Sequence, residues 1–221
     1  MKAQRYYPVY ANLTGRACLV VGGGLIAQRK VTTLLEHGAV VTVVSPDLTS
    51  RLQAWAKSGK IALARRRFRP ADLRGKWLVY AATDDQAVNE EVFAHAQRSR
   101  IFCNVVDQTR LCSFIAPAIL KRGPLTIAIS TGGRSPAMAK ELRGRLGRAI
   151  GPEYLRMLRL IRAVRPQAKR RLATYGDRKR YFDVLLKGKV FALVRSGHEK
   201  KAMQEAQRLM NKAAVAGKAK A

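Results

Sequence analysis

Residues 17–27 read ACLVVGGGLIA. The first five residues form a short apolar run of strand length, and three glycines follow it directly. Beyond the glycines, Leu25–His37 carries apolar residues at helical spacing and stops before Gly38. A strand, a glycine-rich turn and a helix in this order are typical of a unit in which the turn binds the phosphates of a nucleotide.

The glycine-rich turn fits the pattern G-x-G-x-x-A, with Gly22 and Gly24 as its glycines and Ala27 at its end. The first glycine permits a tight turn, the second lets the backbone approach a pyrophosphate, and the alanine lets the helix pack closely on the strand. The N–H groups at the start of the helix then face the phosphates. A glycine-rich turn without a ligand is the alternative. The predicted nucleotide contacts are Gly22, Gly23, Gly24, Leu25 and Ile26.

Four more strand-like runs follow the first. They are Val40–Val44, Ile61–Ala64, Trp77–Ala82 and Ile101–Val106. Helical patterns separate them, including Gln86–Arg98 and an amphipathic stretch that ends near Lys57. Strands that alternate with helices predict a parallel sheet covered on both faces, with right-handed crossovers. The predicted fold class is therefore α/β, with a Rossmann-like doubly wound sheet.

The regular alternation of strands and helices ends after Asp107. Leu125–Thr131 is strongly strand-like, Ser135 and Pro136 begin a helix, and helical spacing continues from Pro152 apart from an ambiguous run at Val190–Val194. From about Ala213 the sequence is of low complexity, which predicts a frayed end.

Polar residues follow the strands at the edge where parallel sheets bind ligands. In this fold an acidic residue at the tip of the second strand usually binds the adenosine ribose, and Asp47 lies slightly beyond that position. Asp47 is therefore either a ribose ligand or a helix cap. No arginine stands at that strand tip in the sequence, which favours NAD over NADP, although Arg51 is one helical turn beyond Asp47. Asp107 ends the fifth strand and could act as a general acid or base, or as a loop or capping carboxylate, whereas Asp84 fits a cap better.

Composition excludes several classes of protein. Of the 221 residues, 48% are hydrophobic, which indicates a folded core, and no apolar run approaches the length of a membrane span. The N-terminus has no apolar signal region, so a cytoplasmic protein is expected. Cys18, Cys103 and Cys112 form no C-x-x-C pair and are expected to be reduced, and the scattered histidines predict no metal site.

The charge is large and uneven. The net charge is +29, and Arg134–Ala221 contributes +18 of it, from 24 Lys/Arg against 6 Asp/Glu. A solvated helical face, a lysine-rich tail, a nucleic-acid surface and a site for a polyanionic small molecule all account for such an excess. No RNP, zinc-finger or homeodomain pattern accompanies the charge, which disfavours nucleic acid as a partner.

Five blocks of sequence together resemble the precorrin-2 dehydrogenase family, which includes the N-terminal part of multifunctional siroheme synthases. The blocks occur in the family's order and cover about residues 7–150. They are Leu19–Gly24 with Ala27, Arg29 and Lys30; Ala81–Asp85 with Val88 and Asn89; Phe102–Asp107; Ser113–Ala118; and Ser130–Pro136.

The resemblance implies oxidation of precorrin-2 to sirohydrochlorin with NAD as the hydride acceptor and, in some members, Fe(II) insertion by a sirohydrochlorin ferrochelatase activity. It implies a homodimer with an NAD-binding domain at residues 1–112, a dimerisation region at 113–150 and a basic helical domain at 151–221. Further nucleotide contacts fall at Pro46, Asp47, Thr83 and Asn104.

The family's essential aspartate matches Asp107, which moves the balance toward a catalytic role. Ser130, Thr131 and Gly132 are expected to line the substrate cleft or the dimer contact, with a tight strand-to-helix turn as the alternative. A polycarboxylate macrocycle as substrate also gives part of the positive charge a meaning. Another NAD(P)-dependent oxidoreductase and an NAD-sensing, nucleic-acid-binding regulator are the competing interpretations.

Overall fold

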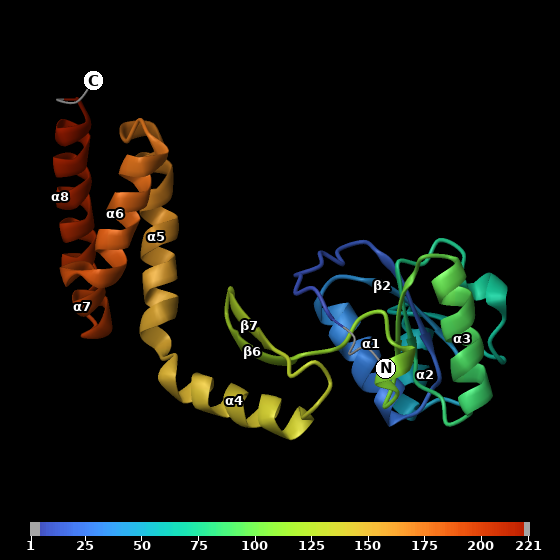
Figure 1. Ribbon diagram of the computed structural model, residues 1–221. Helices are drawn as coiled ribbons and strands as arrows, with labels where there is room; N and C mark the ends of the chain where they lie inside the picture. The colour runs from blue at the N-terminus through green and yellow to red at the C-terminus, as the bar shows by residue number, and fades with distance from the viewer. Residues whose placement is uncertain (1–4, 219–221) are drawn as a thin grey trace. The chain divides into compact units, whose positions relative to one another are not determined.

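The computed structural model describes residues 5–218, and Figure 1 shows the course of the chain. The chain divides into two compact units. The first comprises Met1–Ala116 together with Thr131–Ser135, and the second comprises Pro117–Ser130 together with Pro136–Ala221. None of the helices in the described part of the chain is both long and apolar enough to cross a bilayer.

The first unit is built on a parallel sheet of five strands in the order β3-β2-β1-β4-β5. The strands are β1 (Ala17–Val21), β2 (Val40–Val44), β3 (Ala62–Ala64), β4 (Leu78–Ala81) and β5 (Phe102–Val105). In the register of the sheet, Val21 pairs with both Val44 and Ala81, so the carboxyl ends of neighbouring strands lie at one edge. The predicted Rossmann-like topology is confirmed, with three of the strands slightly shorter than expected.

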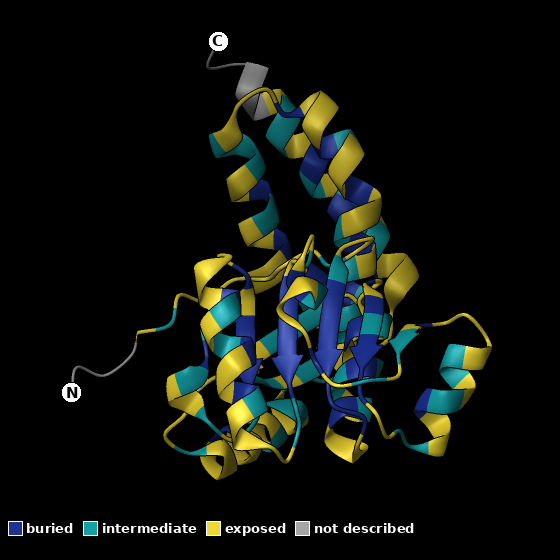
Figure 2. Cartoon of the chain, turned by 90° about the vertical axis from the view of Figure 1, so that its right-hand side faces the viewer, coloured by how far each residue is buried: buried dark blue, intermediate teal, exposed yellow. Residues whose placement is uncertain are grey.

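Helices cover both faces of this sheet. They are α1 (Leu25–Glu36), α2 (Ser50–Lys57) and α3 (Gln86–Arg98), with short 3₁₀ turns η1 (Pro70–Leu73) and η2 (Thr109–Leu111). Alternate residues of β1 enter two different cores: Val20 packs in a cluster with Val31 of α1, and Leu19 in a cluster with Val92 of α3. Figure 2 shows strands in the middle of the sheet in the dark blue of buried residues. The sheet is therefore doubly wound.

The second unit begins with an antiparallel hairpin and continues as helices. The elements are β6 (Ala118–Arg122), β7 (Leu125–Ile129), α4 (Pro136–Ala149), α5 (Pro152–Arg171), α6 (Tyr175–Lys187), α7 (Lys189–Arg195) and α8 (Glu199–Lys218). Helices α5 to α8 share one core, in which Met157, Leu185 and Met210 are almost fully buried.

Two expectations for the second unit change. The run Val190–Val194 is helical in α7, because Val190 and Val194 lie one turn apart and bury the same face in the core of the helices. The end expected to fray from Ala213 is helical as far as Lys218, and residues 219–221 lie outside the described residues. Contacts group the hairpin and α4 with the later helices, so a separate dimerisation region at 113–150 stays a prediction.

Candidate functional site at the carboxyl edge of the sheet

The chain's own backbone requires the first two glycines of the turn after β1. Gly22 has a φ of +116°, and a Cβ there would overlap the carbonyl of Ala82. A Cβ on Gly23 would overlap the carbonyl oxygen of Asp47. Main-chain hydrogen bonds fix both glycines, from Gly22 N–H to the carbonyl of Val44 (2.9 Å) and from Thr49 N–H to the carbonyl of Gly23 (2.9 Å). These hydrogen bonds tie the turn to the end of β2 and to Thr49, just before α2.

The third glycine faces open space. A Cβ on Gly24 would meet nothing within 4 Å, and Gly24 caps α1 without any side-chain hydrogen bond. The first N–H groups of a helix have no acceptor inside the helix. Leu25 and Ile26 in this turn are 65% and 42% exposed, although both are large and apolar. These free donors and the open space above Gly24 fit the pyrophosphate of NAD, which the sequence predicted here.

Two polar residues follow β2. The hydroxyl of Ser45 is buried and donates to the carbonyl of Asp47 (2.7 Å), while the Asp47 side chain is exposed. The residue that caps α2 is Thr49, whose hydroxyl oxygen accepts from the N–H of Leu52 (3.3 Å). Asp47 is therefore not the helix cap, and its role as a ribose ligand stays a prediction.

An arginine does lie at the tip of β2, contrary to the expectation from sequence. It is Arg65, directly after β3, and its Nε donates to the carbonyl of Pro46 (3.3 Å). Because β3 pairs with β2, the fold brings this side chain to the strand tip from a distant part of the sequence. Arg51, which the sequence places one helical turn beyond Asp47, stacks on the ring of Trp55.

Thr83, after β4, is held by a buried asparagine that sequence reasoning did not select as a site residue. Asn89 Oδ1 accepts from the hydroxyl of Thr83 (2.9 Å) and from its N–H (3.3 Å). Asn89 Nδ2 in turn donates to the carbonyl of Thr83 (2.9 Å). The cap of α3 is Asp85, which accepts from two backbone N–H groups, and not Asp84 as expected. A polar residue on the inner side of an amphipathic helix was the available signal for Asn89.

Asn104 is buried in β5, and its side-chain amide forms hydrogen bonds with other residues of the chain. Its Nδ2 donates to the carbonyl of Phe114 (3.0 Å) and approaches Cys112 Sγ (3.4 Å). The Cys112 thiol donates to the carbonyls of Val105 and Gln108, both at 3.3 Å. Asn104 therefore braces the loop after β5, and its contact with a nucleotide stays a prediction.

Asp107 lies in that loop with two marks of a functional turn. It is exposed and has a φ of +60°, a left-handed conformation that only one other non-glycine residue, Arg100, shares in the described chain. The side-chain oxygen Oε1 of the next residue, Gln108, is buried and accepts no hydrogen bond from the described residues. Buried acceptors without a partner are rare and often occur where a ligand binds.

The predicted substrate segment divides between the units. Thr131 and Gly132 belong to the first unit and Ser130 to the second. The hydroxyl oxygen of Thr131 accepts from the N–H of Ser135 (3.0 Å), which closes a tight turn. A Cβ on Gly133 would lie 2.8 Å from Cγ2 of Thr109, so this turn lies against η2, two residues beyond Asp107. The structure thus brings Thr131 and Gly132 to the loop of Asp107.

Three family models match the chain in succession. One described as putative NAD(P)-binding matches residues 9–118. One described as sirohaem biosynthesis protein central matches residues 122–149, and one described as sirohaem synthase dimerisation region matches residues 153–210. The chain belongs to the siroheme synthase and precorrin-2 dehydrogenase family.

Relatives of known name agree with this family. Siroheme synthase 2 of Yersinia enterocolitica is 43% identical over 182 residues, which are 82% of this chain and 38% of that protein. Siroheme synthase of Nitrosococcus oceani is 38% identical over 198 residues, 90% of this chain and 42% of that protein. The chain therefore spans about two fifths of the length of these relatives.

A solved structure has the same fold along its whole length. It is named SirC, precorrin-2 dehydrogenase, and matches with a TM-score of 0.74 at 27% identity, covering 92% of this chain and 100% of that one. The first unit of this family member is thus an NAD-binding domain, with the glycine turn and the loop of Asp107 at one edge of its sheet.

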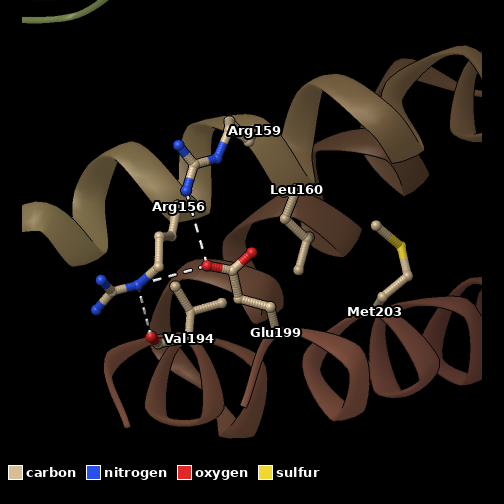
Figure 3. Close-up of a pocket in the computed structure, with 6 residues that line it drawn as sticks. All are labelled: Arg156, Arg159, Leu160, Val194, Glu199 and Met203. Carbon is tan, nitrogen blue, oxygen red and sulfur yellow. Dashed lines mark hydrogen bonds and ion pairs between the residues drawn. The ribbon is translucent and has the colours of Figure 1, made fainter. Parts of the chain in front are cut away.

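The helical unit contains a separate hollow of about 220 Å³ (Figure 3). Arg156 Nε donates to the carbonyl of Val194 (3.2 Å), and Glu199 Oε1 lies 3.9 Å from Arg156 and 3.7 Å from Arg159. Glu199 thus offsets part of the positive charge around the hollow. The lining residues are Arg156, Arg159, Leu160, Val194, Glu199 and Met203.

Proposed function

We propose that this chain oxidises precorrin-2 to sirohydrochlorin, with NAD as the hydride acceptor. The observation that carries the proposal is the pairing of an open glycine turn at Gly24 with the strained, exposed Asp107 on the same sheet edge. The name of the solved neighbour, precorrin-2 dehydrogenase, supports the choice of substrate, because that chain is matched over its whole length.

The residues of the turn after β1 bind and orient the cofactor. The backbone N–H groups at Leu25 and Ile26 receive the pyrophosphate at the start of α1, and Asp47 accepts hydrogen bonds from the adenosine ribose. Thr83, fixed by Asn89, and Asn104 line the site farther along the edge. When bound, NAD supplies the hydride acceptor.

Asp107 accepts the proton that leaves the macrocycle. The oxidation removes two hydrogens from precorrin-2, one as a hydride to NAD and one as a proton, so a base beside the substrate completes the balance. Thr131 and Gly132 lie on the same loop cluster and are proposed to contact the substrate. Positive charge around the site attracts the carboxylates of the macrocycle.

A homodimer and a cytoplasmic location belong to the same proposal. The match of residues 153–210 to a sirohaem synthase dimerisation region supports the dimer. Cys18, Cys103 and Cys112 are all free and buried, as is usual in reducing compartments.

The test measures the oxidation of precorrin-2 in the presence of NAD by visible absorbance, for the wild-type protein and for Asp107→Asn. We expect formation of sirohydrochlorin by the wild type and a loss of at least about 100-fold in Asp107→Asn, because general-base catalysis contributes about that much. Asp183→Asn, an exposed carboxylate on α6, is the matched control and should keep the wild-type rate.

NAD binding by each variant is measured separately, so that a lost base is distinguished from a lost cofactor. Wild-type protein that binds NAD and leaves precorrin-2 unchanged would contradict the proposal. Adding Fe(II) to the product then tests metal insertion, for which siroheme formation is the readout.

A further inference from the structure

Arg65 lies directly after β3, at the point where β2 also ends. In the register of the sheet, Ala64 pairs with Val44, the last residue of β2. The carbonyl of Ala64 also accepts from the N–H of Ser45 (3.2 Å) and from the N–H of Arg66 (2.9 Å). Because the residues on both sides of Arg65 take part in these hydrogen bonds, its backbone is fixed beside the tip of β2.

The guanidinium of Arg65 is only partly used within the chain. Its Nε donates to the carbonyl of Pro46 (3.3 Å), and the side chain is exposed. Among residues 5–218, no group forms a hydrogen bond or an ion pair with its two Nη atoms. A guanidinium is charged at every physiological pH, and its planar set of N–H donors fits two oxygens of one phosphate. Arg65 therefore offers an oriented anion-binding group at the tip of β2.

Other polar groups near this tip have partners or the opposite charge. The hydroxyl of Ser45 donates to the carbonyl of Asp47 (2.7 Å), and Arg51 stacks on the ring of Trp55 (4.9 Å from its centroid). The carboxylate of Asp47 is exposed and forms no ion pair with Arg65. The tip of β2 thus carries an acceptor, Asp47, and a separate cationic donor, Arg65.

Arg65 also begins a strongly basic segment, RRRFR at residues 65–69. Arg66 is paired with Asp72 (2.6 Å). Arg65, Arg67 and Arg69 are exposed, and none of them forms an ion pair within the described residues. The excess of positive charge favours an anion here and offsets the repulsion from Asp47.

The position of Arg65 has a specific meaning in an NAD-binding sheet. The adenosine ribose lies at the tip of the second strand, where an acidic residue binds the 2′-hydroxyl of NAD and a nearby arginine accommodates the 2′-phosphate of NADP. In this chain the acidic residue and the arginine lie at the same tip.

We propose that Arg65 determines the cofactor specificity of this site: its free Nη groups bind the 2′-phosphate of NADP, so that the site accepts NADP in addition to NAD. The inference rests on the proposed function for the place of the adenosine ribose, beside Asp47. Recognition of the 2′-phosphate does not depend on precorrin-2.

The first test measures Kd values by calorimetry for 5′-AMP and for 2′,5′-ADP, which differ only in the 2′-phosphate. We expect the wild type to bind 2′,5′-ADP about tenfold more tightly, because the phosphate adds charge-assisted hydrogen bonds. Arg65→Met should abolish this difference and leave the Kd for 5′-AMP unchanged. Arg65→Lys should recover part of it, since a lysine keeps the charge without the planar pair of donors.

Two controls separate this site from general attraction to a basic protein. Arg98→Met removes an exposed arginine on α3 whose Nε likewise donates to a backbone carbonyl at 3.3 Å, and it should bind both nucleotides as the wild type does. The isomer 3′,5′-ADP has the same charge as 2′,5′-ADP with the phosphate on the other hydroxyl, and it should bind more weakly.

The second test repeats the titrations with NAD and NADP. Arg65→Met should raise the Kd for NADP at least about tenfold and leave that for NAD within about twofold. Asp47→Asn removes the negative charge beside the phosphate, so it should tighten NADP and weaken NAD, each by about threefold. Arg65→Gln serves if the methionine variant does not fold.

Wild-type protein that binds 2′,5′-ADP no more tightly than 5′-AMP or 3′,5′-ADP would overturn the proposal, and so would equal losses in Arg65→Met and Arg98→Met. If NADP binds through Arg65 and neither cofactor supports oxidation of precorrin-2, the inference stands and the proposed function fails. If NAD supports the oxidation while Arg65→Met binds NADP as the wild type does, the function stands and the role of Arg65 fails.

Discussion

The two units of this chain place their important groups by different means. In the first unit, main-chain hydrogen bonds join the ends of neighbouring strands, such as Gly22 N–H to Val44 and Val106 N–H to Ala81, and the site loops grow from these joints. In the second unit, apolar side chains such as Met157 and Leu185 hold four helices together. Backbone placement permits few substitutions and positions a site well, whereas side-chain packing accepts changes that preserve volume.

The two units also differ in how far their cationic side chains are exposed. Most cations of α5 are exposed on the side away from its core, for instance Arg162 and Arg165. In the first unit, Lys30 is half-buried and aimed at a ring. The cations of α5 thus lie mostly at the surface, whereas Lys30 is held over an aromatic ring inside the first unit.

The largest expected effect on stability comes from a substitution that disrupts the main-chain contacts of the glycine turn in the first unit. Gly23→Ala places a methyl group on the carbonyl oxygen of Asp47, and we expect a loss of at least about 4 kcal/mol in the free energy of unfolding. Hydrogen exchange should locate the loss in the first unit. Wild-type protection there would mean that backbone placement is not the constraint.

The corresponding substitution in the second unit removes a buried apolar side chain from the core of the helices. Leu185→Ala leaves a cavity among the helices and should cost about 3 kcal/mol, because Leu185 is fully buried. Leu186→Ala, at an exposed neighbouring position, should cost less than about 0.5 kcal/mol. Denaturant titration measures both, and NAD affinity should stay unchanged in each.

A third change separates ligand binding from folding at the glycine turn. Gly24→Ala has room within the protein, so the free energy of unfolding should stay within about 0.5 kcal/mol of wild type. The added methyl group stands where the pyrophosphate is proposed to approach, so the Kd for NAD should rise at least about tenfold, or 1.4 kcal/mol. Calorimetric titration with NAD gives the Kd, and an unchanged value would move the cofactor away from Gly24.

The smallest effect concerns acid stability. Hydrogen bonds from Arg66 (2.6 and 2.8 Å) and from the N–H of Arg69 hold the pKa of Asp72 below its usual range. A depressed carboxyl pKa stabilises the fold above the unfolded value, near 3.9, and this stabilisation is lost as the pH falls through the folded value. Asp72→Asn should therefore cost up to about 1 kcal/mol at pH 7 and flatten the loss of stability below pH 4. Glu205→Gln on α8, opposite the exposed Arg208, is the comparison in the second unit and should change less.

The sequence predicted the strands and the glycine turn well because their signals are local. Short apolar runs rich in valine form β1 and β2, and the residues that follow them, Gly22 after β1 and Ser45-Pro46 after β2, mark the ends of both strands. Helix caps were harder, since Asp84 and Asp85, or Asp47 and Thr49, are suitable types within one turn of each other. Only the backbone geometry decides which side chain reaches the N–H groups.

Residues brought together by strand pairing were beyond sequence reasoning. Arg65 reaches the tip of β2 because β3 lies beside β2, and Lys30 of α1 lies over the Tyr80 ring because β4 lies beside β1. Neither relation has a fixed spacing along the chain. The run in α7 was ambiguous for a related reason, because burial among helices outweighs the strand preference of valine.

The return of Thr131–Ser135 to the first unit has a practical consequence for dissecting the protein. The chain leaves the first unit at Pro117, comes back at Thr131 and leaves again at Pro136. A truncation after Ala116 yields a nucleotide-binding fragment that lacks the turn lying against Thr109, and one after Ser135 keeps the hairpin without its helices. No single stop codon isolates either unit intact, so expression of the separate parts calls for a circularly permuted or internally deleted gene.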